Sequence, residues 1–402
     1  MKSRDALRLA CAGALLFALA AAGCGGSAKD ELVIGEYGSL TGNDATFGQS
    51  TKMGVEVALD ELVANKGGMI GGLKVRVVVE DDQGKPEEAA SVVQKLINQD
   101  RVIAIVGEVA SSRSLAGAPI CQQNQVPMIS PSSTNPRVTL VGDYIFRMCY
   151  LDDFQGHVIA RWTADSLKLK NVAVLKDVKN DYSVALAQYA TEELLKHGGK
   201  VLIEQSYSSG DQDFRAQLTA IKAKHPQAII LPGYYTEVGL IGRQARELGL
   251  TVPIIGGDGW ESEKLLEIGG TALNGSYYTN HWSLDQPNSK LQAFLAAYRK
   301  KFSGDPDAIA GLAYDGAGVL FQSMEKLATD DPETFKALAS SKAGSEARKA
   351  AEKKLRDLLA STAGYEGVTG TVTMDENRNP KKPIVVIAIK EGKKTAAAIL
   401  NP

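Results

Sequence analysis

The sequence lacks a strong excess of either charge. Its 402 residues include 45 basic and 47 acidic side chains, for a formal net charge of −2. Nucleic-acid-binding proteins and proteins that dock on anionic lipid usually carry a clear basic surplus. The balance therefore argues against nucleic acid or a charged membrane surface as the main partner.

Enzyme motifs are also missing. The chain has no Gly-x-Ser-x-Gly elbow, Walker A loop, Gly-x-Gly-x-x-Gly fingerprint, His-Glu-x-x-His motif or calcium loop. The four histidines share no local spacing with carboxylates or with each other, so we expect surface or structural roles for them: His157, His197, His225 and His281. We expect no enzyme activity, no metal and no cofactor, although a hydrolase that uses Ser111 with a distant histidine stays as a rival.

Cysteine is rare. Of four cysteines, Cys11 and Cys24 lie in the N-terminal segment, so only Cys121 and Cys149 belong to the body of the chain. These two lack the close spacing of a zinc or thioredoxin-type site. In an oxidising compartment they form either one disulfide or two buried thiols, and we slightly favour the disulfide.

The N-terminal segment contains the long apolar run Leu9–Ala22, which follows the basic residues Lys2, Arg4 and Arg8. A basic start, a short apolar run and small residues before a processing site are the parts of an export signal. The run is short for a membrane-spanning helix. We expect residues 1–23 to be a signal peptide that places the protein outside the cytoplasm.

Cys24 follows small residues and precedes Gly25-Gly26-Ser27, so the segment resembles a bacterial lipoprotein signal. Ala21 stands where such signals usually have Leu. The resemblance implies a lipidated Cys24, a tether over residues 24–30, and a location in the periplasm or on the outer face of the membrane. The alternative is an ordinary secretory signal that is cleaved nearby.

The body of the chain alternates between short apolar segments and amphipathic segments. Strands are expected at 32–35, 73–79, 102–106 and 127–130, and again near 172–175, 201–203, 228–231 and 254–255. Segments whose apolar residues have helical spacing lie between these strands, for example over 48–64, 86–98 and 111–124. Continuous apolar strands between amphipathic helices favour parallel sheets covered on both faces. Two such blocks predict an α/β fold with two doubly wound lobes.

The C-terminal part is expected to be helical first and then extended. Helices are predicted over 289–302, 309–327 and about 345–359, the last one charged and peripheral. Residues 368–374 and 384–389 are predicted to form a closing pair of strands.

A set of motifs, in order along the chain, resembles the type I periplasmic binding proteins, in the leucine/isoleucine/valine-binding branch that feeds ABC importers. The motifs are Gly38-Ser-Leu-Thr-Gly42, Asn65-Lys-Gly-Gly-Met-Ile-Gly71, Asp81-Asp82, Met128-Ile-Ser-Pro-Ser-Ser-Thr-Asn-Pro136, Tyr144-Ile-Phe-Arg147, Gly233-Tyr-Tyr-Thr-Glu237 and Gly367-Val-Thr-Gly-Thr-Val-Thr-Met-Asp375. The resemblance implies a Venus-flytrap architecture with a three-strand hinge. Lobe one would comprise 31–151 plus 282–366, and lobe two 152–281 plus 367–402.

Two hydroxyl residues point to a binding site on physical grounds as well. Ser111 lies where a strand gives way to a helix, so its hydroxyl and the free N–H groups of the first turn can hold an anion. Thr134 lies in a loop beside the same strand ends, where open parallel sheets bind ligands. The alternative is that Ser111 only caps a helix and Thr134 only stabilises a turn.

The resemblance assigns the remaining site residues. The carbonyl of Ser132, the hydroxyl of Thr134 and the carboxylate of Asp258 would receive an α-ammonium group, Asp258 standing where the branched-chain binders have Glu. The other implied residues are Tyr234 near the polar end of the ligand, Tyr182 closing over it, and Phe47 and Val109 at its side-chain end. Two further residues come from position alone: Trp260 as a pocket wall and, with less support, Glu108 facing the cleft.

We therefore expect a monomeric, lipid-anchored solute-binding protein that captures a branched-chain or related amino acid for an ABC permease. A binder or sensor of aromatic or other small carboxylates with the same fold is the alternative.

Overall fold

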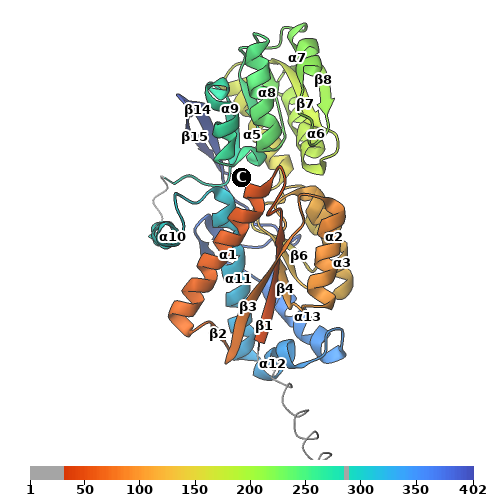
Figure 1. The fold of residues 1–402 in the computed structure, drawn as a ribbon, viewed down its shortest axis with the longest axis vertical. Coiled ribbons are helices and arrows are strands. Elements are labelled where there is room, and N and C mark those ends of the chain that lie inside the picture. Colours follow the sequence, from red (N-terminus) through yellow and green to blue (C-terminus); the bar gives the residue numbers. More distant parts are fainter. Residues whose placement is uncertain (1–30, 285–288) are drawn as a thin grey trace, which may run out of the picture.

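A computed structural model describes residues 31–284 and 289–402, so the predicted signal peptide, Cys24 and the tether lie outside the described residues. Two lobes stand one above the other along the long axis of the molecule (Figure 1). Within the described ranges, no helix has both the length and the apolar character needed to cross a membrane.

Lobe one is built on a six-stranded sheet. In spatial order its strands are β2 (Met69–Ile70), β3 (Leu73–Asp81), β1 (Glu31–Gly38), β4 (Ala104–Val106), β5 (Met128–Ser130) and β6 (Ile145–Arg147). All neighbouring pairs are parallel except β2 with β3. Every residue of β4 and β5 is buried, as expected for strands covered on both faces.

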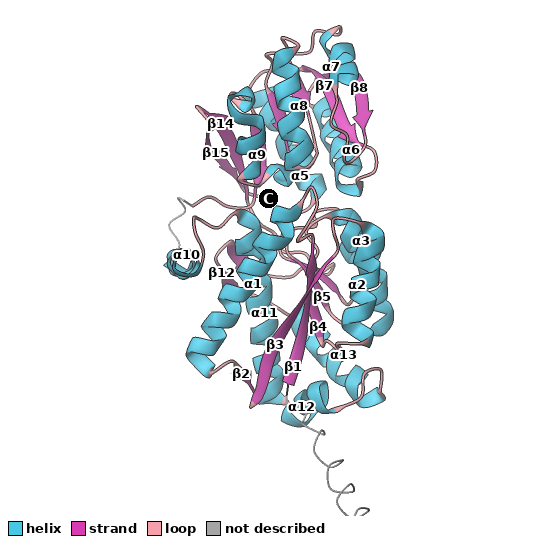
Figure 2. Ribbon diagram, viewed as in Figure 1, coloured by secondary structure: helices cyan, strands magenta, loops and turns pink. Residues whose placement is uncertain are grey.

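Helices cover both faces of this sheet (Figure 2). One apolar core joins the sheet to α1 (Ala45–Lys66), α10 (Ser289–Lys301), α11 (Ala308–Asp330), α12 (Pro332–Ser340) and α13 (Glu346–Ala360). A second core, on the other face, joins it to α2 (Pro86–Asn98) and α3 (Ser111–Asn124). The short helix α4 (Arg137–Leu140) precedes β6.

Lobe two has a seven-stranded sheet. In spatial order its strands are β15 (Lys393–Leu400), β14 (Ile384–Lys390), β11 (Tyr277–Asn280), β10 (Ile254–Gly256), β9 (Ala228–Ile230), β7 (Asn171–Asp177) and β8 (Lys200–Tyr207). The strands from β11 to β8 are parallel, and β14 and β15 add an antiparallel edge.

The helical segments of lobe two follow the same alternation. They are α5 (Asp152–Arg161), the π-helix Trp162–Ser166, α6 (Asp181–Lys196), α7 (Arg215–Lys222), α8 (Tyr235–Glu247), the 3₁₀ turn Asp258–Trp260, α9 (Lys264–Gly269) and the 3₁₀ turn Gly270–Leu273. The predicted α/β fold with two lobes is confirmed. The sheets are mixed rather than wholly parallel.

The predicted pairing of the C-terminal strands was wrong. Residues 365–372 form their own hairpin from β12 (Tyr365–Gly367) and β13 (Gly370–Val372), and β14 pairs with β15. Gly370, with a φ of 103°, allows the tight turn of the first hairpin. Two adjacent hairpins therefore replace the single long one that we expected.

The third crossing between the lobes also lies later than predicted. Val368 and Val372 are buried in the core of lobe one, and Arg378 donates to the carbonyl of Ile145 on β6 over 3.0 Å. The chain joins the second sheet only at Ile384. Residues 367–380 thus pack on lobe one rather than lobe two, because their apolar side chains complete its core.

The structure contradicts the favoured disulfide. Cys121 and Cys149 are both free thiols and fully buried. Cys121 lies in the core under α2 and α3, whereas Cys149 lies in the core on the opposite face of the sheet. Burial raises the pKa of both thiols, so they behave as small apolar side chains.

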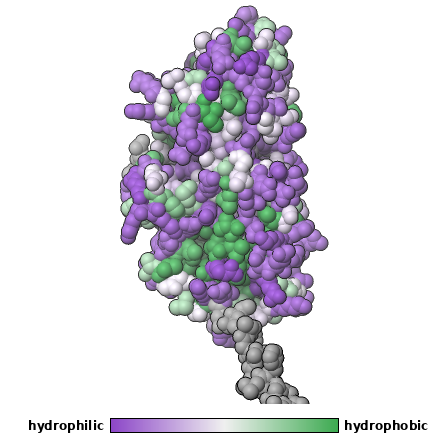
Figure 3. Space-filling model, viewed as in Figure 1, coloured by the Kyte–Doolittle hydropathy of each residue, from purple (hydrophilic) through white to green (hydrophobic). Residues whose placement is uncertain are grey.

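The surface is largely polar on the face shown in Figure 3. Hydrophilic residues cover most of that view, and apolar residues gather over the middle of lobe one.

Candidate functional site

A cavity lies between the lobes, at the carboxyl ends of the parallel strands of both sheets. Its volume is about 10 Å³, so the two lobes are closed upon one another around it. Ten residues line it: Phe47, Val109, Ser111, Ser132, Thr134, Tyr182, Tyr234, Asp258, Gly259 and Ile309. Eight of the nine predicted ligand-site residues are in that set, and Trp260 is not.

A wider cleft of about 610 Å³ lies beside this cavity and shares Tyr234 with it. Asp44, Arg113 and Glu237 line the cleft. Charged side chains of both lobes therefore meet in this cleft.

The lobe-one wall comes from two neighbouring strands. Ser111 opens α3 just after β4, and Ser132 and Thr134 follow β5. Because β4 and β5 are parallel neighbours, both loops emerge at the same sheet edge. The Ser111 hydroxyl accepts a hydrogen bond from the Asn135 backbone N–H at 3.3 Å, which joins the two loops.

A buried arginine holds the second loop in place. Arg147 of β6 has no exposed surface and donates to the carbonyls of Ser133 and Asn135. Its Nε also donates to Oδ1 of Asn379 over 2.7 Å. The polar backbone around Ser132 and Thr134 is thereby fixed before any ligand arrives.

The lobe-two wall comes from three strand ends. Tyr182 lies in the first turn of α6 after β7, Tyr234 precedes α8 after β9, and Asp258 opens the 3₁₀ turn after β10. The rings of Tyr182 and Tyr234 are stacked, with centroids 5.5 Å apart. Phe47 of lobe one meets Tyr234 edge-on at 5.2 Å, so aromatic rings from both lobes enclose one end of the cavity.

Asp258 is the acidic centre of the cavity, and three side chains donate to it. Its Oδ1 accepts from Gln155 Nε2 at 2.8 Å, and its Oδ2 accepts from His281 Nε2 at 2.9 Å and from Ser132 Oγ at 3.4 Å. A carboxylate only accepts hydrogen bonds, so His281 carries its proton on Nε2. The contact with Ser132 links Asp258 directly to lobe one.

Sequence reasoning missed Gln155 and His281. Both are buried, on α5 and on the second crossing segment. The predicted passage from lobe two to lobe one at residues 281–282 was the available signal for His281, because a segment that passes between lobes must border the cleft.

A second acid, Asp152, is buried at the start of α5. Burial and then the charge of Asp258 raise the pKa of Asp152 well above its usual range. Burial therefore favours the uncharged form of Asp152.

Glu108 does not line the cavity. It is fully buried beneath the Ser111 loop, where it accepts from the backbone N–H of Ala110 and from Ser39 Oγ at 3.2 Å. Arg113 Nε lies 3.1 Å from its carboxylate. Burial raises the pKa of Glu108 to about 7, although the charge of Arg113 opposes that rise. Its role is to hold the loop.

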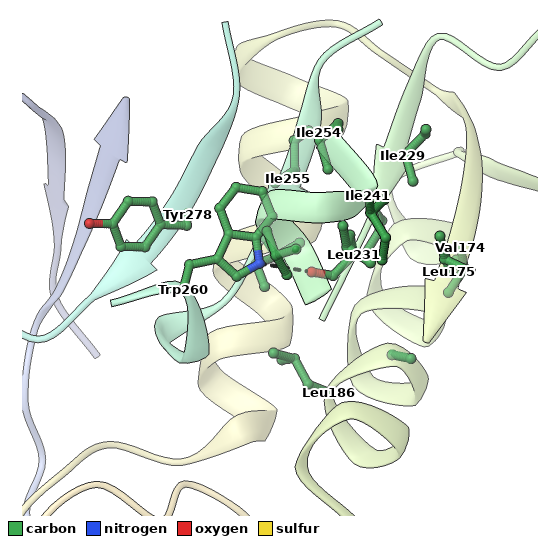
Figure 4. Packing of buried hydrophobic residues seen from close by; sticks show 14 of the residues in the cluster. Val174, Leu175, Leu186, Ile229, Leu231, Ile241, Ile254, Ile255, Trp260 and Tyr278 are labelled. Atoms are coloured by element: carbon green, nitrogen blue, oxygen red, sulfur yellow. Dashed lines mark hydrogen bonds between the residues drawn. The ribbon is translucent and has the colours of Figure 1, made fainter. Parts of the chain in front are cut away.

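Trp260 belongs to the core of lobe two rather than to a pocket wall (Figure 4). Its side chain has no exposed surface, its Nε1 donates to the carbonyl of Leu231 over 3.1 Å, and its ring stacks on Tyr278. Gly256 makes room for the indole, since a Cβ there would lie 2.2 Å from the ring. The prediction that Trp260 forms one wall of the ligand pocket was wrong, because its side chain points into the core of lobe two.

The chain is similar to known binding proteins over most of its length. Residues 31–394 match the family model described as periplasmic binding protein. The leucine-, isoleucine-, valine-, threonine- and alanine-binding protein of Pseudomonas aeruginosa is 33% identical over 308 residues, which cover 76% of this chain and 81% of that protein.

Two solved structures share both fold and sequence with the chain. The leucine binding protein LivK of Thermotoga maritima has a TM-score of 0.83 and 34% identity, over 92% of this chain and 99% of that one. The branched-chain amino acid transporter substrate binding protein LivJ of Streptococcus pneumoniae, solved with isoleucine, has a TM-score of 0.81 and 32% identity, over 92% and 100%.

Proposed function

Because the chain belongs to the periplasmic binding protein family, as its motifs predicted, we propose that it captures an amino acid, branched-chain or related, for an ABC importer. Membership of this family makes it a binding protein and not an enzyme. The proposal rests on two kinds of polar group that face each other across one cavity. Strand-end hydroxyls and helix N–H groups lie on lobe one, and a buried carboxylate lies on lobe two.

This opposition suits a zwitterion. Ser111 and Thr134, with the first turn of α3, would bind the ligand carboxylate without any cationic side chain. Asp258, with Ser132 and Thr134, would receive the ammonium group. Phe47, Val109 and Ile309 would enclose an apolar side chain, while Tyr234 would lie near the polar end of the ligand and Tyr182 would close over it.

The delivery partner and the location follow from the same proposal. A closed monomer with ligand would present both lobes to the permease, and Cys24 would hold the protein by lipid in the periplasm or at the outer face of the membrane. Mass spectrometry of membrane-fractionated protein should show lipidated Cys24 as the first residue, and Cys24→Ser should remove the lipid. An unmodified Cys24, or a different first residue, would contradict the anchor.

Calorimetry of branched-chain amino acids and their deaminated analogues tests the ligand class. Asp258→Asn keeps the shape of the side chain but leaves an ammonium unpaired, so amino-acid affinity should fall by at least about tenfold, on the order of 1.4 kcal/mol. Asp213→Asn, on an exposed stretch before α7, is the matched control and should bind normally.

One observation favours the carboxylate alternative. His281 and Gln155 already donate to Asp258, so this carboxylate has partners without an ammonium. If the deaminated acid binds as tightly as the amino acid, and Asp258→Asn leaves both affinities intact, the protein is a binder of simple or aromatic carboxylates.

A further inference from the structure

A cluster of two histidines and a glutamate lies on lobe two, outside the ligand site. His157 comes from α5, and Glu193 and His197 come from the end of α6 and the residue after it. Glu193 is eleven positions beyond Tyr182 of the cavity, so roughly 16 Å of helix separates the cluster from the site. None of the three residues takes part in the proposed function.

The three ligating atoms converge. Oε1 of Glu193 lies 2.8 Å from Nδ1 of His157 and 3.3 Å from Nε2 of His197, and all three atoms lie within 4.8 Å of one another. The three side chains are half-buried rather than free on the surface. α5 packs along α6, which fixes the spacing of the cluster.

Asp165 orients one ring of the cluster. It lies in the π-helix that follows α5, and its Oδ2 is 2.7 Å from Nδ1 of His197. A carboxylate at this distance accepts a hydrogen bond from Nδ1, and the opposite ring nitrogen, Nε2, then points toward Glu193. Carboxylates hold metal-binding histidines in this way.

The Glu193 carboxylate divides its two oxygens between the histidines and a lysine. Oε1 of Glu193 faces one nitrogen of each ring, at 2.8 Å from His157 and 3.3 Å from His197. The other oxygen, Oε2, accepts a hydrogen bond from Lys196 Nζ over 2.8 Å, which leaves Oε1 directed at the two rings. Arg161 lies 3.5 Å from the other nitrogen of His157, but its side chain is exposed and can turn away.

We propose that His157 Nδ1, Glu193 Oε1 and His197 Nε2 bind a divalent zinc ion, with Asp165 as the positioning residue for His197. Zinc prefers imidazole and carboxylate ligands at about 2.0–2.1 Å in tetrahedral geometry, which needs only small shifts of these side chains. Water would take the fourth position. The ion would clamp α5 to α6, the helices that carry Gln155 and Tyr182.

Calorimetric titration of the untagged protein with zinc chloride, after treatment with EDTA, tests the site. We expect one equivalent of zinc, bound at micromolar concentration or below. His157→Ala and His197→Ala should each weaken binding at least about tenfold, and Asp165→Asn about tenfold, as loss of an outer-shell carboxylate usually does. His225→Asn is the matched control, since His225 is exposed with a φ of 49° that Asn adopts readily, and it should bind zinc as wild type does.

Thermal unfolding supplies a second readout. Saturating zinc should raise the melting temperature of wild type and of His225→Asn but not of His157→Ala or His197→Ala. The melting curves without zinc show whether each variant is folded. Zinc binding that is absent, weaker than millimolar, or equally strong in His157→Ala and wild type would overturn the proposal, whatever the amino-acid affinity turns out to be.

Discussion

At the scale of single residues, the carboxyl group of Glu36 on β1 is buried in lobe one. Glu36 is 1% exposed, and its Oε2 has no hydrogen-bond partner among the described residues. Burial and then Glu56 raise the pKa of Glu36 to about 8, with Lys52 opposing. The folded state therefore keeps this proton at a pH where the unfolded chain, with a pKa near 4.5, has lost it.

The pH dependence of stability follows from that difference. Since the folded state binds more protons, the free energy of unfolding should fall as pH rises from about 5 to about 8. Glu36→Gln removes the titration, so relative to wild type it should gain at least about 1 kcal/mol over that range. Chemical unfolding at several pH values measures the gain. Exposed Glu376→Gln is the control, and parallel curves for wild type and Glu36→Gln would show that Glu36 does not titrate in this range.

The residues of the site were predictable only where motif and strand end coincide. Ser111, Thr134, Tyr234 and Asp258 lie two to five residues beyond the end of a strand, so their position at the cavity could be inferred from sequence. Trp260 lies two residues after Asp258, but a 3₁₀ turn directs its side chain away from the cavity and into the core. His281 contacts Asp258 from another segment, a tertiary contact that no local pattern encodes.

At the scale of helices and strands, the periodicity of apolar residues predicted the alternation of strands and helices within both lobes but not the pairing of the C-terminal strands. Residues 368–374 and 384–389 both read as strands, and each pairs with a neighbour other than the expected one. Lys382 marks the point at which the chain leaves lobe one for lobe two. It is buried on lobe one, donating to Thr369 and lying 3.9 Å from Asp315, and Ile384 begins the second sheet two residues later. A buried lysine paired across distant segments gives no hydropathy signal.

At the scale of the whole molecule, the lobes are closed and held together by polar contacts outside the cavity. Thr236 Oγ1 donates to the carbonyl of Asn43 over 2.8 Å, and Asn135 Nδ2 donates to the carbonyl of Asp181 over 3.0 Å. Hinge closure of two lobes around a ligand is the motion this architecture permits. Apparent affinity then depends on the fraction of molecules that reach the closed form as well as on contacts with the ligand.

Thr236→Val tests this dependence without touching the cavity. The change removes one contact between the lobes, worth about 0.5–1.5 kcal/mol, so the apparent affinity for the ligand should fall roughly two- to tenfold. Thr219→Val is the matched control, because Thr219 is exposed on α7, at the end of lobe two away from lobe one (Figure 1). Small-angle scattering of the ligand-free protein should show a larger radius of gyration for Thr236→Val than for the control, and both variants should become equally compact at saturating ligand. Unchanged affinity together with an unchanged radius would mean that ligand contacts alone hold the lobes together.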